Sequence, residues 1–515
     1  MRGKTEKKEF GDYQTPPDFA EMVCKYLYDD LNIRPKFIIE PTAGVGAFLK
    51  ASLNIFKESE KVFGVEIYEK YCDKCREILD DRLTIICDDF FNFNTPSIVD
   101  TDSKVLIVGN PPWVTNSDLE YNLPKKMNFK KLSGTDAITG ASNFDICEYM
   151  ILKLIEEFKN TDATIAMLCK TSVARNVFQE IYRRNINSGY FKIINFNATK
   201  IFNISASACL LVIDLKREYC NLPICEVSDI EDPTMITSII KCSDGVLTNI
   251  SENVLDLEGN CCFEWRQGVK HDCSSIMELK KIGSNIYENK RKEKVKLEET
   301  LVFPLMKSSS FKKPIISDNF SKFVIVTQKK TRDDTKYIRK LAPLTWKYLN
   351  DNIKLFDKRK SSIYRGAPPF SMFGVGDYSY SKYKVGVSGF YKKPLFSLLF
   401  NCEDIAKPIM LDDTSYFISF ENYDDAYTCM LMLNSDKVQD FLYSISFQDA
   451  KRPYTKKVLQ RLDIEKCIKK IKLKDLMETE LKYQLPKYIT DNIFDNFKNR
   501  LFEEYKIDFG VQLSF

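Results

Sequence analysis

The chain has 515 residues, 44% of them apolar and 29% charged, which is enough for two or three domains with packed cores. Its 76 Lys and Arg against 72 Asp and Glu leave a net charge of +4, and its single histidine, His271, excludes His-based triads and multi-His metal sites. It lacks a membrane-length apolar run and a secretory signal, so we expect a cytoplasmic protein, which the motifs below associate with DNA. Its sixteen cysteines are therefore expected to be reduced thiols.

The first 215 residues alternate between short β-rich runs and helical stretches, the pattern of a parallel α/β sheet. Helices are expected from the glycines after the first strand to about residue 58, from about 68 to 79, and over 144–159 and 173–185. The strands are predicted at residues 36–40, 61–66, 83–89, 104–110, 164–170, 191–197 and 208–215.

Chemically informative residues follow the first four strands at intervals of about 22 residues, one per βα unit: Gly44, Glu66, Asp89 and Asn110. Open α/β sheets bind ligands outside the carboxyl ends of their strands. The pair Gly44 and Gly46 lets the backbone approach a ligand, although tight strand–helix packing explains such a pair equally well. Glu66 stands where nucleotide-binding folds place a ribose-binding acid, although such an acid is often only a helix cap. The chain has neither GxGxxG nor GxxxxGK[ST], which favours a nucleoside ligand without phosphates.

The sequence Asn110-Pro111-Pro112-Trp113 after the fourth strand is the strongest signal in the chain. Two prolines hold the backbone extended, so that the Asn110 amide and the Pro111 carbonyl project as a pair of hydrogen-bond acceptors. Trp113 adds a stacking face. A strand-ending turn is the alternative. Two acceptors of this kind can bind both N–H groups of an exocyclic amine without a histidine or a metal.

These motifs, in this order, resemble those of the gamma-class (TaqI-like) N6-adenine DNA methyltransferases of type II restriction–modification systems. The resemblance covers about 200 residues and implies an N-terminal Rossmann-like class I methyltransferase domain, with a mostly parallel sheet, over residues 1–225. It also implies a C-terminal mixed α+β target-recognition domain over residues 226–515, helical from about 459 to 505. The matching segments are GDYQTP (11–16), EPTAGVGAF (40–48), GVEI (64–67), DDF (88–90) and NPPW (110–113).

The resemblance also implies roles for individual residues, with S-adenosyl-L-methionine as the cofactor. Thr15 and its neighbours would close over the methionine part of the cofactor. Glu66 would bind the ribose, and Asp89 would accept a hydrogen bond from the adenine, with Asp88 as an adjacent competitor. The cofactor-binding residues implied are Thr15, Glu40, Thr42, Gly44, Gly46, Glu66, Ile67, Asp89, Phe90 and Asn110. The catalytic residues implied are Asn110, Pro111, Pro112 and Trp113, with Trp113 and Phe202 stacking on the target base.

The predicted function is therefore site-specific methylation of adenine N6 in double-stranded DNA, on a base flipped out of the helix. We expect a monomer on DNA, with a restriction endonuclease acting as a separate protein. Three alternatives stay open: methylation of RNA, methylation of a protein glutamine through the same NPPW motif, and an inactive DNA-binding relative.

One basic region is hidden by the nearly neutral total charge. Residues 281–400 carry 26 Lys and Arg against 10 Asp and Glu, an excess of 16. Such a region indicates a polyanion partner, with a solvated lysine-rich surface as the alternative. The candidate DNA-binding residues in it are Lys329, Lys330, Arg332, Lys358, Arg359 and Lys360.

The cysteine spacing predicts no metal site. Cys72 and Cys75 form a CxxC inside a predicted helix, and Cys261, Cys262 and Cys273 cluster near His271, but no second ligand pair matches the CxxC. We therefore expect these cysteines to be buried or incidental thiols.

Overall fold

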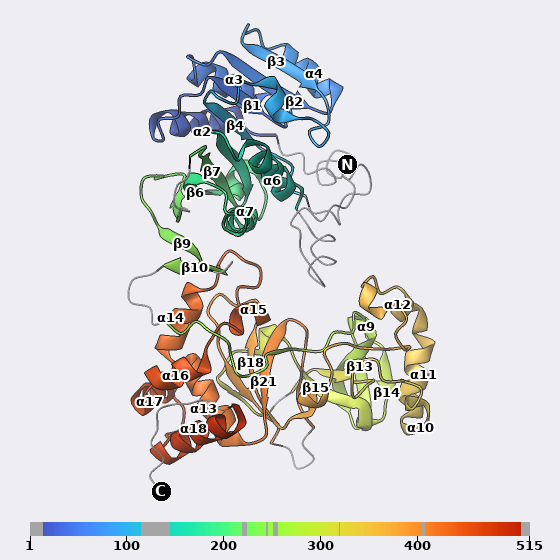
Figure 1. Ribbon diagram of the computed structural model, residues 1–515. Helices are drawn as coiled ribbons and strands as arrows, with labels where there is room; N and C mark the ends of the chain where they lie inside the picture. The colour runs from blue at the N-terminus through green and yellow to red at the C-terminus, as the bar shows by residue number, and fades with distance from the viewer. Residues whose placement is uncertain are drawn as a thin grey trace. The chain divides into compact units, whose positions relative to one another are not determined.

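The computed structural model describes residues 14–114, 145–218, 224–243, 246–250, 256–318, 320–402 and 407–505. The chain divides into two compact units, Met1–Ser251 and Glu252–Phe515 (Figure 1). Gly11, Asp12 and Tyr13 of the GDYQTP segment lie outside the described residues, as does the start of the helix predicted at 144. None of the described helices is both long and apolar enough to cross a membrane.

The described residues of the first unit form one sheet in the order β10-β9-β8-β6-β7-β5-β4-β1-β2-β3. The strands are β1 (Phe37–Glu40), β2 (Lys61–Glu66), β3 (Leu83–Cys87), β4 (Val105–Gly109), β5 (Thr164–Lys170), β6 (Ser188–Asn197), β7 (Ser207–Leu215), β8 (Cys225–Asp229), β9 (Ser238–Ser243) and β10 (Val246–Ile250). Strands β3, β2, β1, β4 and β5 run parallel, whereas β7 is antiparallel to both β5 and β6. This arrangement confirms the predicted Rossmann-like class I methyltransferase fold.

The strand and helix predictions for this unit are confirmed, and most of the predicted elements end sooner in the structure. Its helices are α2 (Pro17–Asp29), α3 (Ala47–Ile55), α4 (Glu69–Arg76), α6 (Ile146–Phe158), α7 (Thr171–Arg184) and α8 (Ala198–Phe202). Every residue of β4 and all but the last of β5 are buried, which explains why both strands read as unbroken apolar runs.

The sheet continues past the predicted domain boundary at residues 225 and 226. Strand β8 begins at Cys225 and pairs in parallel with β6, and β9 and β10 follow it as an antiparallel hairpin. The compact unit therefore extends to Ser251.

The second unit is a mixed α+β structure, as predicted, with two sheets among its described residues. One has the order β11-β21-β18-β19-β16, and the other has the order β14-β13-β12-β17-β15-β20. The strands are β11 (Arg266–Gln267), β12 (Glu278–Gly283), β13 (Ile286–Asn289), β14 (Lys294–Lys296), β15 (Val302–Met306), β16 (Ile315–Ile316), β17 (Phe323–Ile325), β18 (Tyr383–Ser388), β19 (Ser397–Leu399), β20 (Met410–Leu411) and β21 (Ser415–Phe420).

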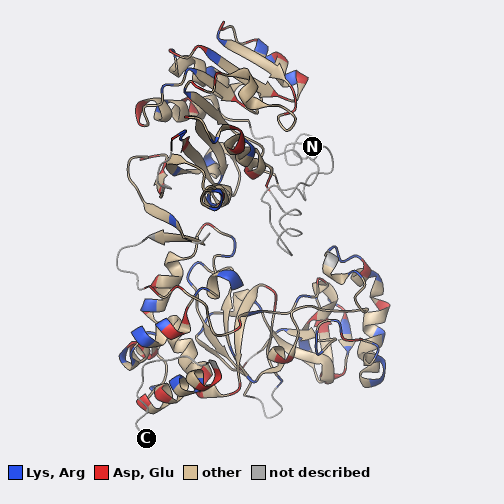
Figure 2. Ribbon diagram, in the orientation of Figure 1, with Lys and Arg blue, Asp and Glu red and all other residues tan. Residues whose placement is uncertain are grey.

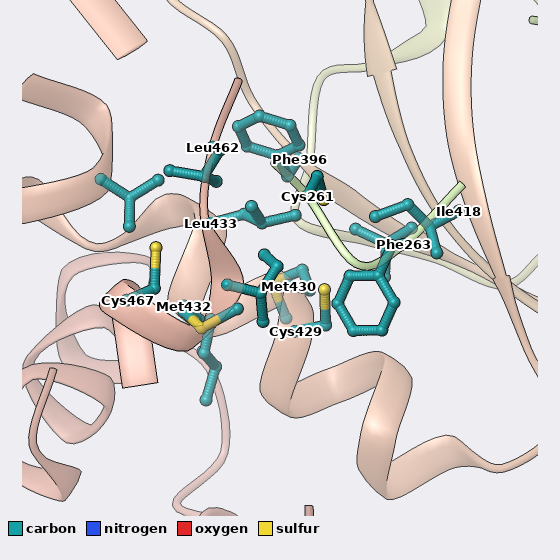
Figure 3. Packing of buried hydrophobic residues seen from close by; sticks show 14 of the residues in the cluster. Cys261, Phe263, Phe396, Ile418, Cys429, Met430, Met432, Leu433, Leu462 and Cys467 are labelled. Atoms are coloured by element: carbon teal, nitrogen blue, oxygen red, sulfur yellow. The ribbon is translucent and has the colours of Figure 1, made fainter. Parts of the chain in front are cut away.

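The helices of this unit pack in two separate hydrophobic clusters, the first four in the smaller cluster and the last six in the main core. They are α9 (Ser274–Met277), α10 (Ile338–Leu341), α11 (Pro343–Asp351), α12 (Ile353–Asp357), α13 (Tyr423–Asn434), α14 (Asp436–Ser444), α15 (Lys456–Leu459), α16 (Ile464–Lys470), α17 (Leu473–Lys482) and α18 (Asp491–Tyr505). Figure 3 shows Met430 and Leu433 of α13 packed among Phe263, Phe396 and Leu462. Helix α13 is buried on nearly every side, so it is the central support of the unit. The helices predicted over 459–505 are confirmed as α16, α17 and α18.

Candidate active site

The carboxyl ends of β1, β2, β3 and β4 lie at one edge of the sheet because these strands run parallel. In the sheet register Glu40 lies beside Gly64 and Glu66 beside Cys87. The loops that follow these strands therefore meet at this edge. They carry the four groups of residues singled out in the sequence, at positions 40–46, 66–67, 88–90 and 110–113.

Glu66 joins the glycine loop after β1 to the end of β2. Its Oε2 accepts a hydrogen bond from the Gly44 N–H at 2.7 Å, and its Oε1 accepts one from the Tyr68 N–H at 3.0 Å. Gly44 and Gly46 have φ angles of +53° and +81°, in the region that glycine adopts without strain. Glu66 is buried, so its charge is held close to this loop.

Gln14 holds the N-terminal segment on the same loop. Its Oε1 accepts a hydrogen bond from the Val45 N–H at 3.0 Å, and a Cβ atom added to Gly44 would lie 2.7 Å from that oxygen. Next to it, the buried Thr15 accepts a hydrogen bond from Asn110 Nδ2 through its Oγ1, at 3.2 Å. The structure thus places Thr15 against Asn110. Gln14 is one of the neighbours of Thr15 that the resemblance assigns to the cofactor, and the structure places it on the glycine loop.

Glu40 is buried beneath the loop, with 3% of its surface exposed. Burial, together with the nearby Glu66 carboxylate, raises the pKa of Glu40 well above its ordinary value of 4.5. Glu40 Oε2 and Thr42 Oγ1 are buried without a hydrogen-bond partner among the described residues. Buried polar atoms are normally satisfied. These two atoms therefore fit a polar, cationic ligand, such as the ammonium group of a cofactor's methionine part.

The segment after β3 presents two adjacent acids in different settings. Asp89 accepts hydrogen bonds from the Phe91 N–H at 2.9 Å and from Asn92 Nδ2 at 3.2 Å, whereas the exposed Asp88 accepts one from the Asp89 N–H at 2.7 Å. Phe90 is buried, with Lys153 Nζ 4.5 Å from its ring centroid.

Ile67, directly after Glu66, faces solvent, with 51% of its surface exposed. An exposed isoleucine beside a ribose-binding acid suits one face of an adenine ring.

Asn110 follows β4 directly and begins a stretch without regular secondary structure that runs to Val114. The hydrogen bond from its Nδ2 to Thr15 orients the amide and leaves Oδ1 as the amide's acceptor atom. Trp113 is 7% exposed, and its Nε1–H donates to the Leu168 carbonyl at 3.1 Å, which fixes the indole against β5.

Trp113 and Phe202 lie in one aromatic cluster with Phe19 and Phe196. The Trp113 and Phe202 centroids are 5.5 Å apart, with the rings inclined by 71°. A base stacked between two rings needs parallel planes roughly 7 Å apart, about twice the ~3.5 Å contact distance. The structure thus brings the two predicted stacking residues together in an edge-to-face contact, without a base-sized slot between their faces.

The candidate DNA-binding residues lie in two loops of the second unit. Lys329, Lys330 and Arg332 are exposed in the turn after β17, where Lys330 pairs with Asp377 at 2.9 Å. Figure 2 shows the Lys and Arg residues of this unit in blue, including those on α10, α11 and α12.

Arg359 differs from its two neighbours after α12. Lys358 and Lys360 are exposed, but Arg359 donates to the carbonyls of Ser371 at 2.6 Å and His271 at 3.2 Å and lies 3.7 Å above the Tyr364 ring. Burial lowers the pKa of Arg359. In this structure Arg359 therefore holds the loop together from inside.

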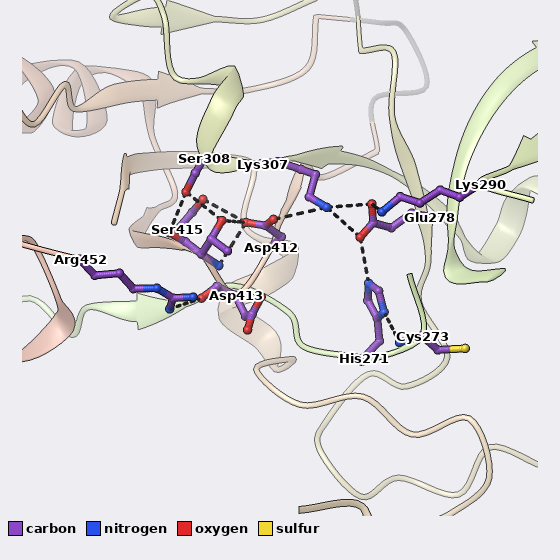
Figure 4. A network of polar contacts seen from close by, with 11 residues as sticks. His271, Cys273, Glu278, Lys290, Lys307, Ser308, Asp412, Asp413, Ser415 and Arg452 are labelled. Atoms are coloured by element: carbon purple, nitrogen blue, oxygen red, sulfur yellow. Dashed lines mark hydrogen bonds and ion pairs between the residues drawn. The ribbon is translucent and has the colours of Figure 1, made fainter. Parts of the chain in front are cut away.

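His271 belongs to a buried polar network of the second unit (Figure 4). Glu278 accepts hydrogen bonds from Lys307 at 2.8 Å and forms an ion pair with Lys290 at 2.8 Å, and His271 Nε2 lies 3.8 Å from it. Burial lowers the pKa of His271 to about 4, so the imidazole is neutral at neutral pH. The network supports the fold of the unit.

Comparison with known proteins gives three findings. Residues 1–300 match the family model described as N-6 DNA Methylase. The type II methyltransferase M.NspV of Nostoc sp. is 39% identical over 479 residues, which cover 90% of this chain and 98% of the relative. The type II methyltransferase M.CvrRI of Paramecium bursaria Chlorella virus XZ-6E is 28% identical over 176 residues, or 34% of this chain and 40% of the relative.

Solved structures resemble the chain more distantly. The ATP-dependent type ISP restriction–modification enzyme LlaBIII, solved on DNA, is aligned over 90% of this chain and 40% of its own, with a TM-score of 0.46 and 11% identity. The methyltransferase subunit of a type I restriction–modification system from Streptococcus thermophilus is aligned over 42% and 47%, with a TM-score of 0.30 and 14% identity.

Proposed function

Because the chain belongs to the N-6 DNA methylase family, we propose that it transfers a methyl group to the N6 atom of one adenine within a specific DNA sequence. The observation that carries this proposal is the position of Asn110 and Pro111 at the end of β4. These two residues directly follow β4, which pairs with β1. The loop after β1 carries candidate cofactor-binding residues. The order of the motifs, with GDYQTP first, supports placement in the gamma class.

The residues around the glycine loop suit S-adenosyl-L-methionine. Glu40 and Thr42 would take the ammonium end, Glu66 the ribose hydroxyls, and Ile67 with Asp89 the adenine. The cofactor supplies a methyl group on a sulfonium, which needs no further activation. The work left to the protein is therefore to hold the acceptor amine in line with that methyl group.

Asn110 and Pro111 would prepare the amine. The lone pair of an adenine amine is delocalised into the ring, which makes it a poor nucleophile. The Asn110 Oδ1 and the Pro111 carbonyl would each accept one N–H, favour a pyramidal nitrogen and free its lone pair. Because Thr15 holds the other end of the Asn110 amide, these acceptor dipoles are oriented before the base arrives. The proton leaves after attack, and the step requires no histidine.

Trp113 and Phe202 would hold the extruded base. Their edge-to-face contact means that one ring must turn as the base enters, and Phe202, which is partly exposed at the end of α8, has the greater freedom. Trp113 is fixed by its bond to Leu168. Stacking of about 1–3 kcal/mol per base would offset part of the cost of unstacking.

The two halves of the chain would divide the task. We assign cofactor binding and catalysis to residues 1–225, extended structurally to Ser251, and DNA binding and sequence recognition to the remainder. Lys329, Lys330, Arg332, Lys358 and Lys360 would bind phosphates, with Arg359 positioning its loop. We further infer a monomer on DNA in the cytoplasm, with any restriction endonuclease a separate protein.

Expression in a bacterium without its own DNA methylation tests the function. Genomic DNA would be sequenced by a method that detects N6-methyladenine, and we expect methylation at one short recurring sequence. An unmethylated genome, together with methylated RNA or methylated protein glutamine in the same cells, would overturn the proposal in favour of one of the other NPPW-bearing enzyme types. The Asn110→Ala chain is the matched control.

A further inference from the structure

Three side chains from α4 and the end of β3, two thiols and one carboxylate, meet in a cluster beside the candidate active site. Cys72 Sγ lies 2.8 Å from Cys87 Sγ, and Cys87 Sγ lies 2.9 Å from Glu69 Oε2. One ligand atom from each residue lies within 4.8 Å of those from the other two. We propose that Glu69, Cys72 and Cys87 bind one zinc-class divalent cation, with water at the fourth position.

The donor set and the spacing suit such a cation. Zinc is bound by Cys sulfur at ~2.3 Å and by carboxylate oxygen at ~2.0–2.2 Å in tetrahedral sites, which places two bound sulfurs about 3.7 Å apart. The two thiols would therefore move apart by roughly 1 Å. Cys87 can make this movement because it is exposed at the end of β3, whereas Cys72 is fully buried. The exposure of Cys87 also leaves one side open to water.

A divalent cation offsets most of the charge of the cluster. Two thiolates and one carboxylate carry three negative charges, and the cation leaves one. Arg76 faces that remaining charge, since its guanidinium pairs with Glu69 Oε1 at 2.8 Å, and it also pairs with Asp73 at 2.8 Å. The arginine also fixes the Glu69 side chain with its second oxygen directed at Cys87. The carboxylate is thus already positioned as a third ligand.

The sequence pattern concealed this site. The CxxC suggested that Cys72 and Cys75 act together, but Cys75 Sγ points the other way, to the Gly44 carbonyl at 3.4 Å. The partner of Cys72 is Cys87, fifteen residues further on in a different element. The expectation of no metal site rested on the lack of a second ligand pair, and the fold replaces that pair with one cysteine and one glutamate.

A cation here would brace the nucleoside side of the candidate active site. Cys72 Sγ also lies 3.4 Å from the Glu66 carbonyl, which accepts a hydrogen bond from the Asp88 N–H at 3.1 Å. Binding would join the start of α4 to the end of β3 on either side of these residues. We therefore expect the cation to raise the unfolding temperature of the full chain. That the cation supports a cofactor-binding site rests on the proposed function, whereas cation binding itself does not.

Cobalt binding to the full-length protein tests the site. The chain, produced without a histidine tag and fully reduced, would be titrated with Co²⁺, and thiolate ligands would give a charge-transfer band that saturates at one equivalent. Zn²⁺ should displace the cobalt. The variants are Cys87→Ser and Glu69→Gln, with Cys402→Ser, an exposed thiol in the second unit, as the matched control. We expect Cys402→Ser to bind Zn²⁺ as the wild type does. Cys87→Ser should weaken Zn²⁺ binding by at least ~100-fold, because it removes a ligand, whereas loss of a residue that only hydrogen-bonds to a ligand typically costs about 10- to 100-fold.

Two results would overturn the proposal. One is the absence of the band, or a band that Cys87→Ser leaves unchanged. The other is an intact mass two hydrogens lower together with loss of both thiols, which would show that Cys72 and Cys87 form a disulfide in the purified protein. Failure of the proposed function is separate: it would appear as absent S-adenosyl-L-methionine binding in a protein that still takes up one cation.

Discussion

Replacing Glu66 by alanine should weaken both the cofactor site and the fold around it. The substitution removes the acceptor of the Gly44 and Tyr68 N–H groups, which are 2.7 and 3.0 Å from the carboxylate. Hydrogen bonds to a charged group contribute roughly 1.5–3 kcal/mol each. Water can reach part of this loop, so we expect a loss of about 2–4 kcal/mol in the free energy of unfolding. The loss of the ribose acceptor should further weaken S-adenosyl-L-methionine binding by about 1–3 kcal/mol, or ~5- to 150-fold in Kd.

Calorimetric titration with the cofactor and chemical denaturation together measure both losses. Glu60→Ala is the matched control, because Glu60 is an exposed acid next to the other end of β2 that forms a surface ion pair with Lys36 at 3.4 Å. Such pairs contribute at most about 1 kcal/mol, so this variant should bind the cofactor normally. A folded Glu66→Ala protein with unchanged Kd would refute the assignment of Glu66 and the arrangement of the strand ends on which it depends.

Three further predictions concern groups whose environment the structure defines. The pKa of Glu40 is raised on folding, so this residue favours the folded state below pH 4.5 and loses that contribution as the pH rises through its folded pKa. Glu40→Gln should therefore stabilise the cofactor-free chain at neutral pH yet weaken cofactor binding. Equal stability of the variant and the wild type from pH 5 to 8 would contradict this expectation. The pKa of His271 is lowered to about 4, so acidification from pH 6.5 through pH 4 should reduce the free energy of unfolding by about 3 kcal/mol. His271 is the only histidine, so NMR of the labelled imidazole can measure its pKa directly. A titration midpoint near 6.5 would disprove its burial as a neutral group. Replacing Lys358 and Lys360 together by alanine should reduce the slope of log affinity for DNA against log salt by up to ~0.9 per lysine, whereas an unchanged slope would place both lysines on a solvated surface away from DNA.

The sequence predicted the first unit well because each strand end carries its own signal. The apolar runs of β4 and β5, the two glycines after β1, and the acid that ends β2 are local features of a parallel sheet. Their meeting at one edge follows from topology alone.

Other features were not predictable because they depend on side chains that meet across the fold. Gln14 reaches Val45 across 31 residues, and Cys72 reaches Cys87 rather than its CxxC partner. Arg359 sits within a basic triplet, yet it binds the main-chain carbonyl of the distant His271 and that of Ser371, twelve residues further on. Charge and spacing could not separate it from Lys358 and Lys360, whose side chains are exposed.

Little of the second unit could be predicted from the sequence. Its strands are short, several with only two or three residues, so periodicity in the sequence is weak. The last helices were recognisable as a helical stretch, but α13 is buried on almost every side and carries no amphipathic pattern. The register of both sheets became visible only in the structure.

Methyl transfer by the Asn110→Ala protein is the most direct test of the central claim, which is that the acceptors at the end of β4 activate an exocyclic amine. The variant would be incubated with labelled S-adenosyl-L-methionine and with unmethylated DNA that contains the recognition sequence. Cofactor affinity would be measured on the same preparation. The account predicts that product formation is lost while the protein still binds the cofactor, because Glu40 and Glu66 are intact. Near-normal turnover by Asn110→Ala would contradict it.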